Sequence, residues 1–83
     1  MVDRDAVFEQ VAGLVRKYAP GDRPIAPGTE LGTDLNIDSV AAMDLIMEVE
    51  DRFHIDIPIN QVAELRTVQD LADLVIGELG DRS

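Results

Sequence analysis

The sequence contains no cysteine and no tryptophan, and its 83 residues include only seven lysines and arginines. Without cysteine the chain can form no disulfide, so its fold must depend on packing alone, and it has no thiol of its own. No segment approaches the ~18 uninterrupted apolar residues of a membrane span, and the N-terminus lacks the pattern of a secretory leader. We therefore expect residues 1–83 to form a single small domain in the cytoplasm, without a membrane span.

The charge is strongly acidic, because 17 aspartates and glutamates give a net charge of −10. This sign of charge repels nucleic acid and favours partner proteins with basic surface patches. The acids are also clustered. Residues 30–56 contain eight of them and a single base, Arg52, so this third of the chain carries most of the net charge. The clustering indicates a docking surface for proteins.

Apolar residues recur at helical spacing in three long segments and one short one. The long segments are residues 3–18, residues 39–53 and a last helix that Thr67 caps, with Asp70 as a capping-box partner, and that Gly80 ends. One or two helical turns are expected within residues 60–65. The predicted fold is all-α: a small four-helix bundle of three longer helices and one short one, with a long loop between helices 1 and 2.

That loop is long for a connection inside a compact domain. Pro20 and Gly21 are expected to end the first helix, and Asn36, just before the second, is suited to a left-handed backbone conformation. Four apolar residues recur along the loop, so we expect it to be anchored on the core: Ile25, Leu31, Leu35 and Ile37.

Ser39 stands where the loop meets the second helix, with Asp38 as the expected N-cap. Its hydroxyl should lie beside unpaired backbone N–H groups and the positive end of the helix dipole, which favours an attached or bound phosphate. The single histidine, His54, lies a whole helix away and is interpreted as a surface residue. Ser39 thus lacks a base to activate it, which argues against a serine hydrolase.

A spacing of 100° per residue divides the second helix into two faces. One face is a core stripe of Ala42, Leu45, Ile46, Val49 and Phe53. The other face mixes apolar and acidic residues: Val40, Met43, Asp44, Met47, Glu48 and Asp51. Because the core side is already filled, we interpret Met43 and Met47 as part of an exposed binding surface rather than as packed beneath the loop.

Two other hypotheses address the segment before this helix. Asp34, Asn36 and Asp38 match positions 1, 3 and 5 of an EF-hand calcium loop. However, position 6 is Ser39 instead of glycine and position 12 is Leu45 instead of glutamate, so the turn and the strongest ligand would be missing. Plain helix capping explains Asp38 and Ser39, but not the acidic, methionine-bearing face beside them.

The segment Asp34-Leu35-Asn36-Ile37-Asp38-Ser39-Val40 resembles the phosphopantetheine attachment motif of acyl carrier proteins. The likeness covers most of the chain, because the helix, long loop, Asp-Ser pair, acidic helix, short helix and final helix follow in the family's order. Ile57-Pro58 and Thr67-Val68 occupy their usual places, and the segment Met47-Glu48-Val49-Glu50-Asp51-Arg52-Phe53 is similar to the end of the family's second helix.

The resemblance implies a carrier rather than an enzyme, with 4′-phosphopantetheine transferred from coenzyme A to Ser39 by a phosphopantetheinyl transferase. Further partners would be acyl-transferring, condensing or ligase enzymes with basic docking patches. Recognition residues would be Asp38, Val40, Met43, Asp44, Met47, Glu48 and Asp51. A pocket for the attached chain would use Leu45, Ile46, Val49, Val62 and Leu65.

Some positions depart from the family's commonest pattern. Asn36 replaces the usual glycine and Val40 the usual leucine, and neutral residues 59–61 follow Pro58 where general fatty-acid carriers place acids. The resemblance therefore implies a specialised carrier, free-standing and monomeric, that holds acyl groups as thioesters in fatty-acid, lipid or polyketide biosynthesis. Two alternatives stay open: an aminoacyl or peptidyl carrier, and an unmodified acidic protein-interaction module.

Overall fold

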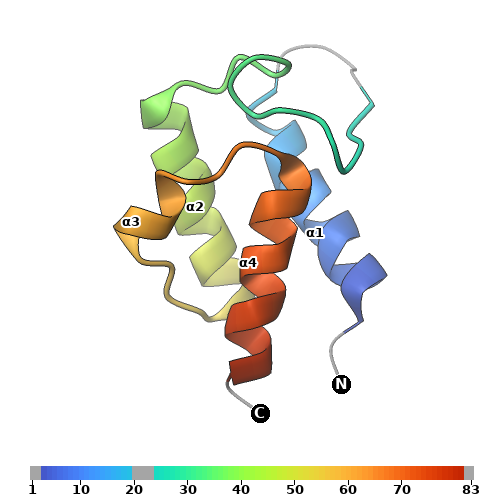
Figure 1. The fold of residues 1–83 in the computed structure, drawn as a ribbon, viewed down its shortest axis with the longest axis vertical. Helices are drawn as coiled ribbons and strands as arrows, with labels where there is room; N and C mark the ends of the chain where they lie inside the picture. Colours follow the sequence, from blue (N-terminus) through green and yellow to red (C-terminus); the bar gives the residue numbers. More distant parts are fainter. Residues whose placement is uncertain (1–2, 20–23, 82–83) are drawn as a thin grey trace.

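The computed structural model describes residues 3–19 and 24–81, which fold into a bundle of helices (Figure 1). In chain order the helices are α1 (Arg4–Arg16), α2 (Ser39–Phe53), α3 (Ile59–Val62) and α4 (Val68–Asp81). α1 packs against both α2 and α4, and the short α3 lies beside α2. The described residues form no strand, apart from an isolated antiparallel bridge between Glu30 and Thr67. The predicted all-α bundle of three longer helices and one short helix is confirmed.

The first helix is slightly shorter than predicted. Asp3 caps it, because its carboxylate accepts hydrogen bonds from the backbone N–H groups of Asp5 and Ala6. The helix ends at Arg16, and the following residues form tighter turns, so the predicted end at residue 18 is two residues too late. Pro20 and Gly21, which were expected to end this helix, lie outside the described residues.

A single hydrophobic core joins the helices and the long loop. Its largest fully buried side chains are Leu35 from the loop, Leu45 from α2 and Leu71 from α4. Burial of one such side chain is worth about 1.5–3 kcal/mol relative to leaving it in water. No polar or charged side chain is buried within the described part of the chain, so the core gains its stability from apolar packing.

The loop between α1 and α2 is anchored on this core, as predicted. Leu31, Leu35 and Ile37 are buried and Ile25 is half-buried. Backbone hydrogen bonds add a second attachment, to the start of α4. Leu31 N–H donates to the Arg66 carbonyl at 2.8 Å, and Val68 N–H donates to the Thr29 carbonyl at 3.0 Å.

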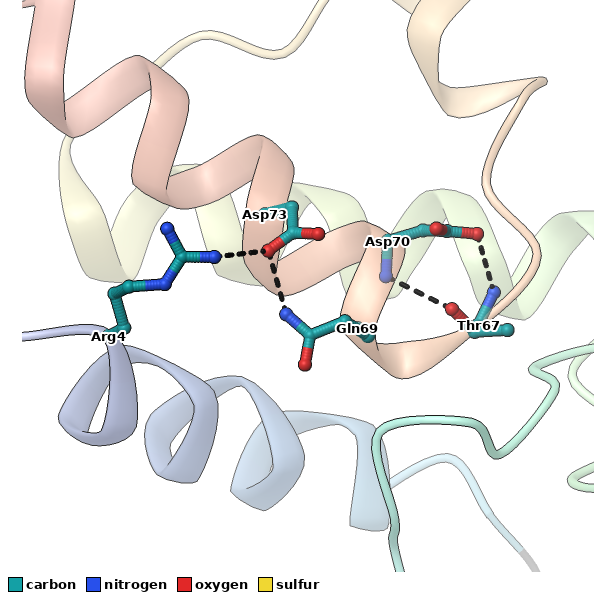
Figure 2. A network of polar contacts seen from close by, with 5 residues as sticks. All are labelled: Arg4, Thr67, Gln69, Asp70 and Asp73. Carbon is teal, nitrogen blue, oxygen red and sulfur yellow. Dashed lines mark hydrogen bonds and ion pairs between the residues drawn. The ribbon is translucent and has the colours of Figure 1, made fainter.

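The start of α4 carries the predicted capping box (Figure 2). Thr67 Oγ1 accepts from the Asp70 N–H at 3.1 Å, and Asp70 Oδ2 accepts from the N–H groups of Thr67 at 3.1 Å and Arg66 at 3.2 Å. Each residue therefore satisfies a donor of the other. The helix continues through Gly80 to Asp81, so the predicted end was wrong by one residue, a difference typical of helix ends.

The second and third helices differ in how well the pattern predicted them. α2 has the predicted bounds at both ends. α3 is a single turn that begins directly after Pro58, one residue earlier than expected, and ends at Val62 instead of Leu65. Its backbone continues in turns, which leave Val62 and Leu65 half-buried against the core. None of the described helices has the length and apolar character needed to cross a membrane.

Candidate functional site

Ser39 is the first residue of α2, and its neighbour caps the helix. The Asp38 backbone is extended, its Oδ1 accepts from the Ala41 N–H at 2.8 Å, and its carbonyl accepts from the Ala42 N–H at 2.8 Å. The N-cap predicted for Asp38 is thus confirmed. The Ser39 side chain is exposed, and its hydroxyl makes no hydrogen bond with the described residues. Since Asp38 supplies the cap, the hydroxyl has no structural task.

The approach to Ser39 is held firmly on the core. Leu35 and Ile37 are buried, and the Ile37 N–H donates to the Leu31 carbonyl at 2.9 Å. Asn36 between them is exposed and has φ of 55°, the left-handed conformation for which the sequence made it suitable. The two anchors therefore place Asp38 and Ser39 at the surface with a defined backbone.

The acids of this segment bind the protein's own backbone. Asp34 Oδ2 accepts from the Glu30 N–H at 2.9 Å, and Asp38 Oδ1 is used by the cap of α2. Within residues 3–19 and 24–81, no three histidine, cysteine, aspartate or glutamate side chains gather as metal ligands would. The segment thus has the geometry of a capped loop rather than of an EF-hand.

The outer surface of α2 is apolar as well as acidic. In the described part of the chain, the large hydrophobic side chains that are exposed are Val40 (73%), Met43 (39%), Met47 (63%) and Ile59 (70%). The first three lie on α2, and the last begins α3. The expectation that Met43 and Met47 are exposed is therefore confirmed. We call the exposed residues of this surface the docking face: Val40, Met43, Asp44, Met47 and Asp51.

Glu48 differs from the other candidate recognition residues because it lies toward α1. Its Oε1 is 3.7 Å from the Lys17 ammonium, and its Oε2 is buried without a hydrogen-bond partner among the described residues. Tyr18, half-buried just beyond α1, lies close to it. Burial, followed by the carboxylates of Glu48 and Asp44, raises the pKa of the Tyr18 phenol. Glu48 therefore takes part in the contact between α1 and α2, and its role in recognition stays a prediction.

An open groove of about 670 Å³ runs beside the C-terminal half of α2. It is lined by Tyr18, Asp44, Met47, Glu48, Glu50, Asp51, His54, Ile55 and Asp56. Five of these side chains are carboxylates and none is a lysine or arginine, so the groove continues the acidic surface of the docking face. His54 is exposed, as predicted, but its left-handed backbone with φ of 56° at the end of α2 was missed.

The residues proposed for an acyl pocket belong to the core. Leu45, Ile46 and Val49 are buried, and Val62 and Leu65 are half-buried against the same hydrophobic core. Of the five, Leu65 also lines a shallow cavity of about 310 Å³ beside α4. The five residues thus belong to the single core of the bundle or pack against it, and their use as a pocket stays a prediction.

Comparisons with known proteins agree with this geometry. The family described as "Phosphopantetheine attachment site" matches residues 6–75. The chain is 31% identical over 78 residues to the acyl carrier protein of Myxococcus xanthus, covering 93% of this chain and 99% of that protein. It is 30% identical over 77 residues to methylphloroacetophenone synthase of Cladonia uncialis, covering 90% of this chain but 3% of the synthase.

A solved structure has the same fold. The crystal structure of an acyl carrier protein from Thermotoga maritima is similar with a TM-score of 0.81 and 25% identity. The similarity covers 96% of this chain and 94% of that one. The arrangement of the four helices is therefore shared over nearly the whole of both chains.

Proposed function

Because this chain belongs to the family of acyl carrier proteins, which bear a covalent 4′-phosphopantetheine group, we propose that Ser39 is the residue to which the group is attached. The observation that carries the proposal is the position of the Ser39 hydroxyl. It is exposed at the start of α2 and is not needed for the cap, which Asp38 supplies. A transferase can therefore reach the hydroxyl without unfolding the helix.

The surroundings of Ser39 suit a phosphodiester. The first N–H groups of a helix have no partner within the helix, and those of Ser39 and Val40 make no hydrogen bond with the described residues. Together with the positive end of the α2 dipole, they favour a phosphate at this position. When bound, the group supplies the terminal thiol that a chain without cysteine lacks, and acyl groups are held there as thioesters.

Acyl carrier proteins are carriers rather than catalysts, and among the described residues the carboxylate beside Ser39, that of Asp38, is used by the helix cap. His54, the single histidine, lies at the opposite end of α2. The hydroxyl must therefore be activated by the modifying enzyme, so the role of this chain is to present Ser39 and bind the partner. We propose that residues 1–83 act as one carrier domain, while its cytoplasmic location and monomeric state remain predictions.

The docking face supports binding of the phosphopantetheinyl transferase and of acyl-transferring, condensing or ligase enzymes with basic patches. Val40, Met43 and Met47 offer apolar area for affinity, while Asp44 and Asp51 steer a basic partner into place. We propose fatty-acid, lipid or polyketide biosynthesis as the setting. Residues 59–61, where α3 begins, carry no charge, which supports partners dedicated to this carrier rather than those of general fatty-acid synthesis.

The proposal is tested by intact mass spectrometry after incubation with coenzyme A and a promiscuous phosphopantetheinyl transferase. The wild-type protein is expected to gain the mass of one phosphopantetheine group, and Ser39→Ala is expected to gain none. Thr33→Ala removes another exposed hydroxyl, from the loop before α2, and should leave the gain unchanged. A gain that persists in Ser39→Ala, or its absence from the wild-type protein, would contradict the assignment.

A further inference from the structure

Glu50 accepts hydrogen bonds from three backbone N–H groups at and just beyond the end of α2. Its carbonyl accepts the His54 N–H, which ends the helix, and the Ile55 N–H at 3.1 Å. Its carboxylate Oε2 accepts the Ile57 N–H at 2.8 Å. The last bond is made by an ionised acceptor in a partly buried place, and such bonds are stronger than those between neutral groups. One side chain thus fixes the segment that leads from α2 to α3.

The position of α3 depends on that segment, because α3 has few attachments of its own. It is a single turn with no side-chain cap and no buried residue. Ile55 and Ile57, which precede it, are buried in the core. The hydrogen bond from Ile57 to Glu50 therefore fixes the last buried residue before α3. It thereby also fixes where α3 begins relative to the core.

Ile59, the first residue of α3, is 70% exposed and comes two residues after Ile57. Glu50 lies on the same flank of α2 as the exposed Met43, because seven residues make about two helical turns. The ribbon of α3 lies next to that of α2 in the view of Figure 1, and Ile59 is the first residue of α3. A surface side chain that is apolar and well placed contributes to binding, whereas the same side chain on a loosely held turn contributes less.

We propose that Glu50 is a positioning residue that holds α3 so that Ile59 extends the docking face into one continuous surface for the phosphopantetheinyl transferase. The inference rests on the proposed function of Ser39. The partner that fits places basic side chains opposite Asp44 and Asp51 and an apolar side chain opposite Ile59, because residues 59–61 carry no charge.

Two substitutions separate the hydrogen bond from the charge of Glu50. Glu50→Asp keeps the charge but shortens the side chain, so its carboxylate no longer reaches the Ile57 N–H. Glu50→Gln loses the charge but keeps an acceptor oxygen at the same distance. We expect amide hydrogen exchange at Ile57 to be about tenfold faster in Glu50→Asp and to change much less in Glu50→Gln, while exchange at the core residue Val49 is unchanged in both.

The transferase supplies the functional readout. Glu50→Asp is expected to raise the KM for the carrier roughly fivefold with kcat unchanged, and Ile59→Ala should do the same, because each weakens the same contact. If Glu50 acts by placing Ile59, the double variant has no higher KM than Ile59→Ala alone. Glu50→Gln should stay close to the wild-type KM.

Several results would overturn the inference. Additive KM effects in the double variant would mean that the two residues act independently. An unchanged KM in Glu50→Asp, despite faster exchange at Ile57, would mean that the bond is merely structural. An unchanged exchange rate would mean that the bond does not hold the segment. In each case the wild-type protein is still modified on Ser39, so the proposed function stands, whereas loss of modification in the wild-type protein would reject both.

Discussion

The starts of α2 and α4 have the same kind of residues but use them differently. At α4, Thr67 and Asp70 satisfy each other's backbone N–H groups (Figure 2). Neighbouring backbone bonds join this turn to the long loop. At α2, the Asp38 carboxylate alone supplies the cap, and the exposed Ser39 hydroxyl bonds to none of the described residues. One helix start is thus closed by the protein itself, and the other leaves a reactive group available.

The carboxylates of the two helices show the same contrast. The Asp70 carboxylate accepts hydrogen bonds from two backbone N–H groups. The bond from the Thr67 N–H is the larger cause, and the bond from the Arg66 N–H a smaller one, of a pKa of Asp70 below its usual value. Two acids of α2, Asp44 and Asp51, are exposed, and burial, followed by the carboxylates of Glu48 and Asp44, raises the pKa of Tyr18. Asp70 thus meets donors at its own helix start, whereas Glu48 and Asp44 act through their charge on a neighbouring side chain.

The largest effect is expected from removing the two hydroxyls in turn. Ser39→Ala should abolish modification by the transferase and change the free energy of unfolding by less than about 0.5 kcal/mol, because the hydroxyl makes no bond to lose. Thr67→Ala should lower that free energy by about 1 kcal/mol, the usual cost of a lost N-cap, and leave modification intact. Urea unfolding and intact mass measure the two quantities.

The same two variants can also show that the starts of α2 and α4 do not differ in this way. A loss of about 1 kcal/mol in Ser39→Ala would show that the serine hydroxyl shares in capping α2. If Thr67→Ala stays folded but is not modified by the transferase, the start of α4 takes part in presenting Ser39.

Local patterns in the sequence predicted both helix starts. Asp38, Thr67 and Asp70 act on backbone groups within three or four residues, so spacing alone identifies them as caps. The spacing of apolar residues likewise predicted the bounds of α2, because a buried face repeats with the period of the helix. The recurrence of apolar residues along the loop predicted its anchoring on the core.

Features that depend on distant partners could not be predicted in this way. The bridge between Glu30 and Thr67 joins residues far apart in the chain, and backbone groups of any sequence can form it. The left-handed conformation of His54 was missed because glycine and asparagine are the residues that usually mark such a helix end. The reach of Glu50 to the Ile57 N–H depends on how the turn folds back, which the helical pattern of α2 does not encode.

A smaller effect is expected from Asp70→Asn, and it depends on pH. A lowered pKa in the folded state means that the ionised carboxylate stabilises the fold above the usual aspartate pKa of about 3.9 and that this contribution is lost as the pH falls through the folded-state pKa. Asp70→Asn should therefore be less stable than the wild-type protein near neutral pH by about 0.5 kcal/mol, a small figure because solvent screens this exposed carboxylate, and the difference should shrink below about pH 4.

Urea unfolding over a pH series measures this difference. Asp44→Asn serves as a control at neutral pH, because it removes a docking-face carboxylate that bonds to none of the described backbone N–H groups and should change stability by less than about 0.5 kcal/mol. If the difference in the free energy of unfolding between Asp70→Asn and the wild-type protein stays constant at acidic pH, the charge of Asp70 does not contribute to the cap.

The smallest effect concerns the ionisation of Tyr18, the single tyrosine of the chain, which makes an ultraviolet titration unambiguous. Its phenol should ionise above the usual pKa of about 10. Glu48→Gln should lower the pKa part of the way toward that value, because the charge of Glu48 is gone while burial still raises the pKa. Glu64→Gln, which removes a charge near α3 instead, should have no effect.

The pKa of Tyr18 is shifted in the opposite direction to that of Asp70. A raised pKa means that the folded state favours the neutral phenol, so this contribution to stability is complete below the usual tyrosine pKa and is lost as the pH rises through the folded-state value. Asp70 contributes in the opposite direction, at the acidic end. If Glu48→Gln leaves the titration of Tyr18 unchanged, the Glu48 carboxylate does not contribute to the shift, and burial and Asp44 account for it.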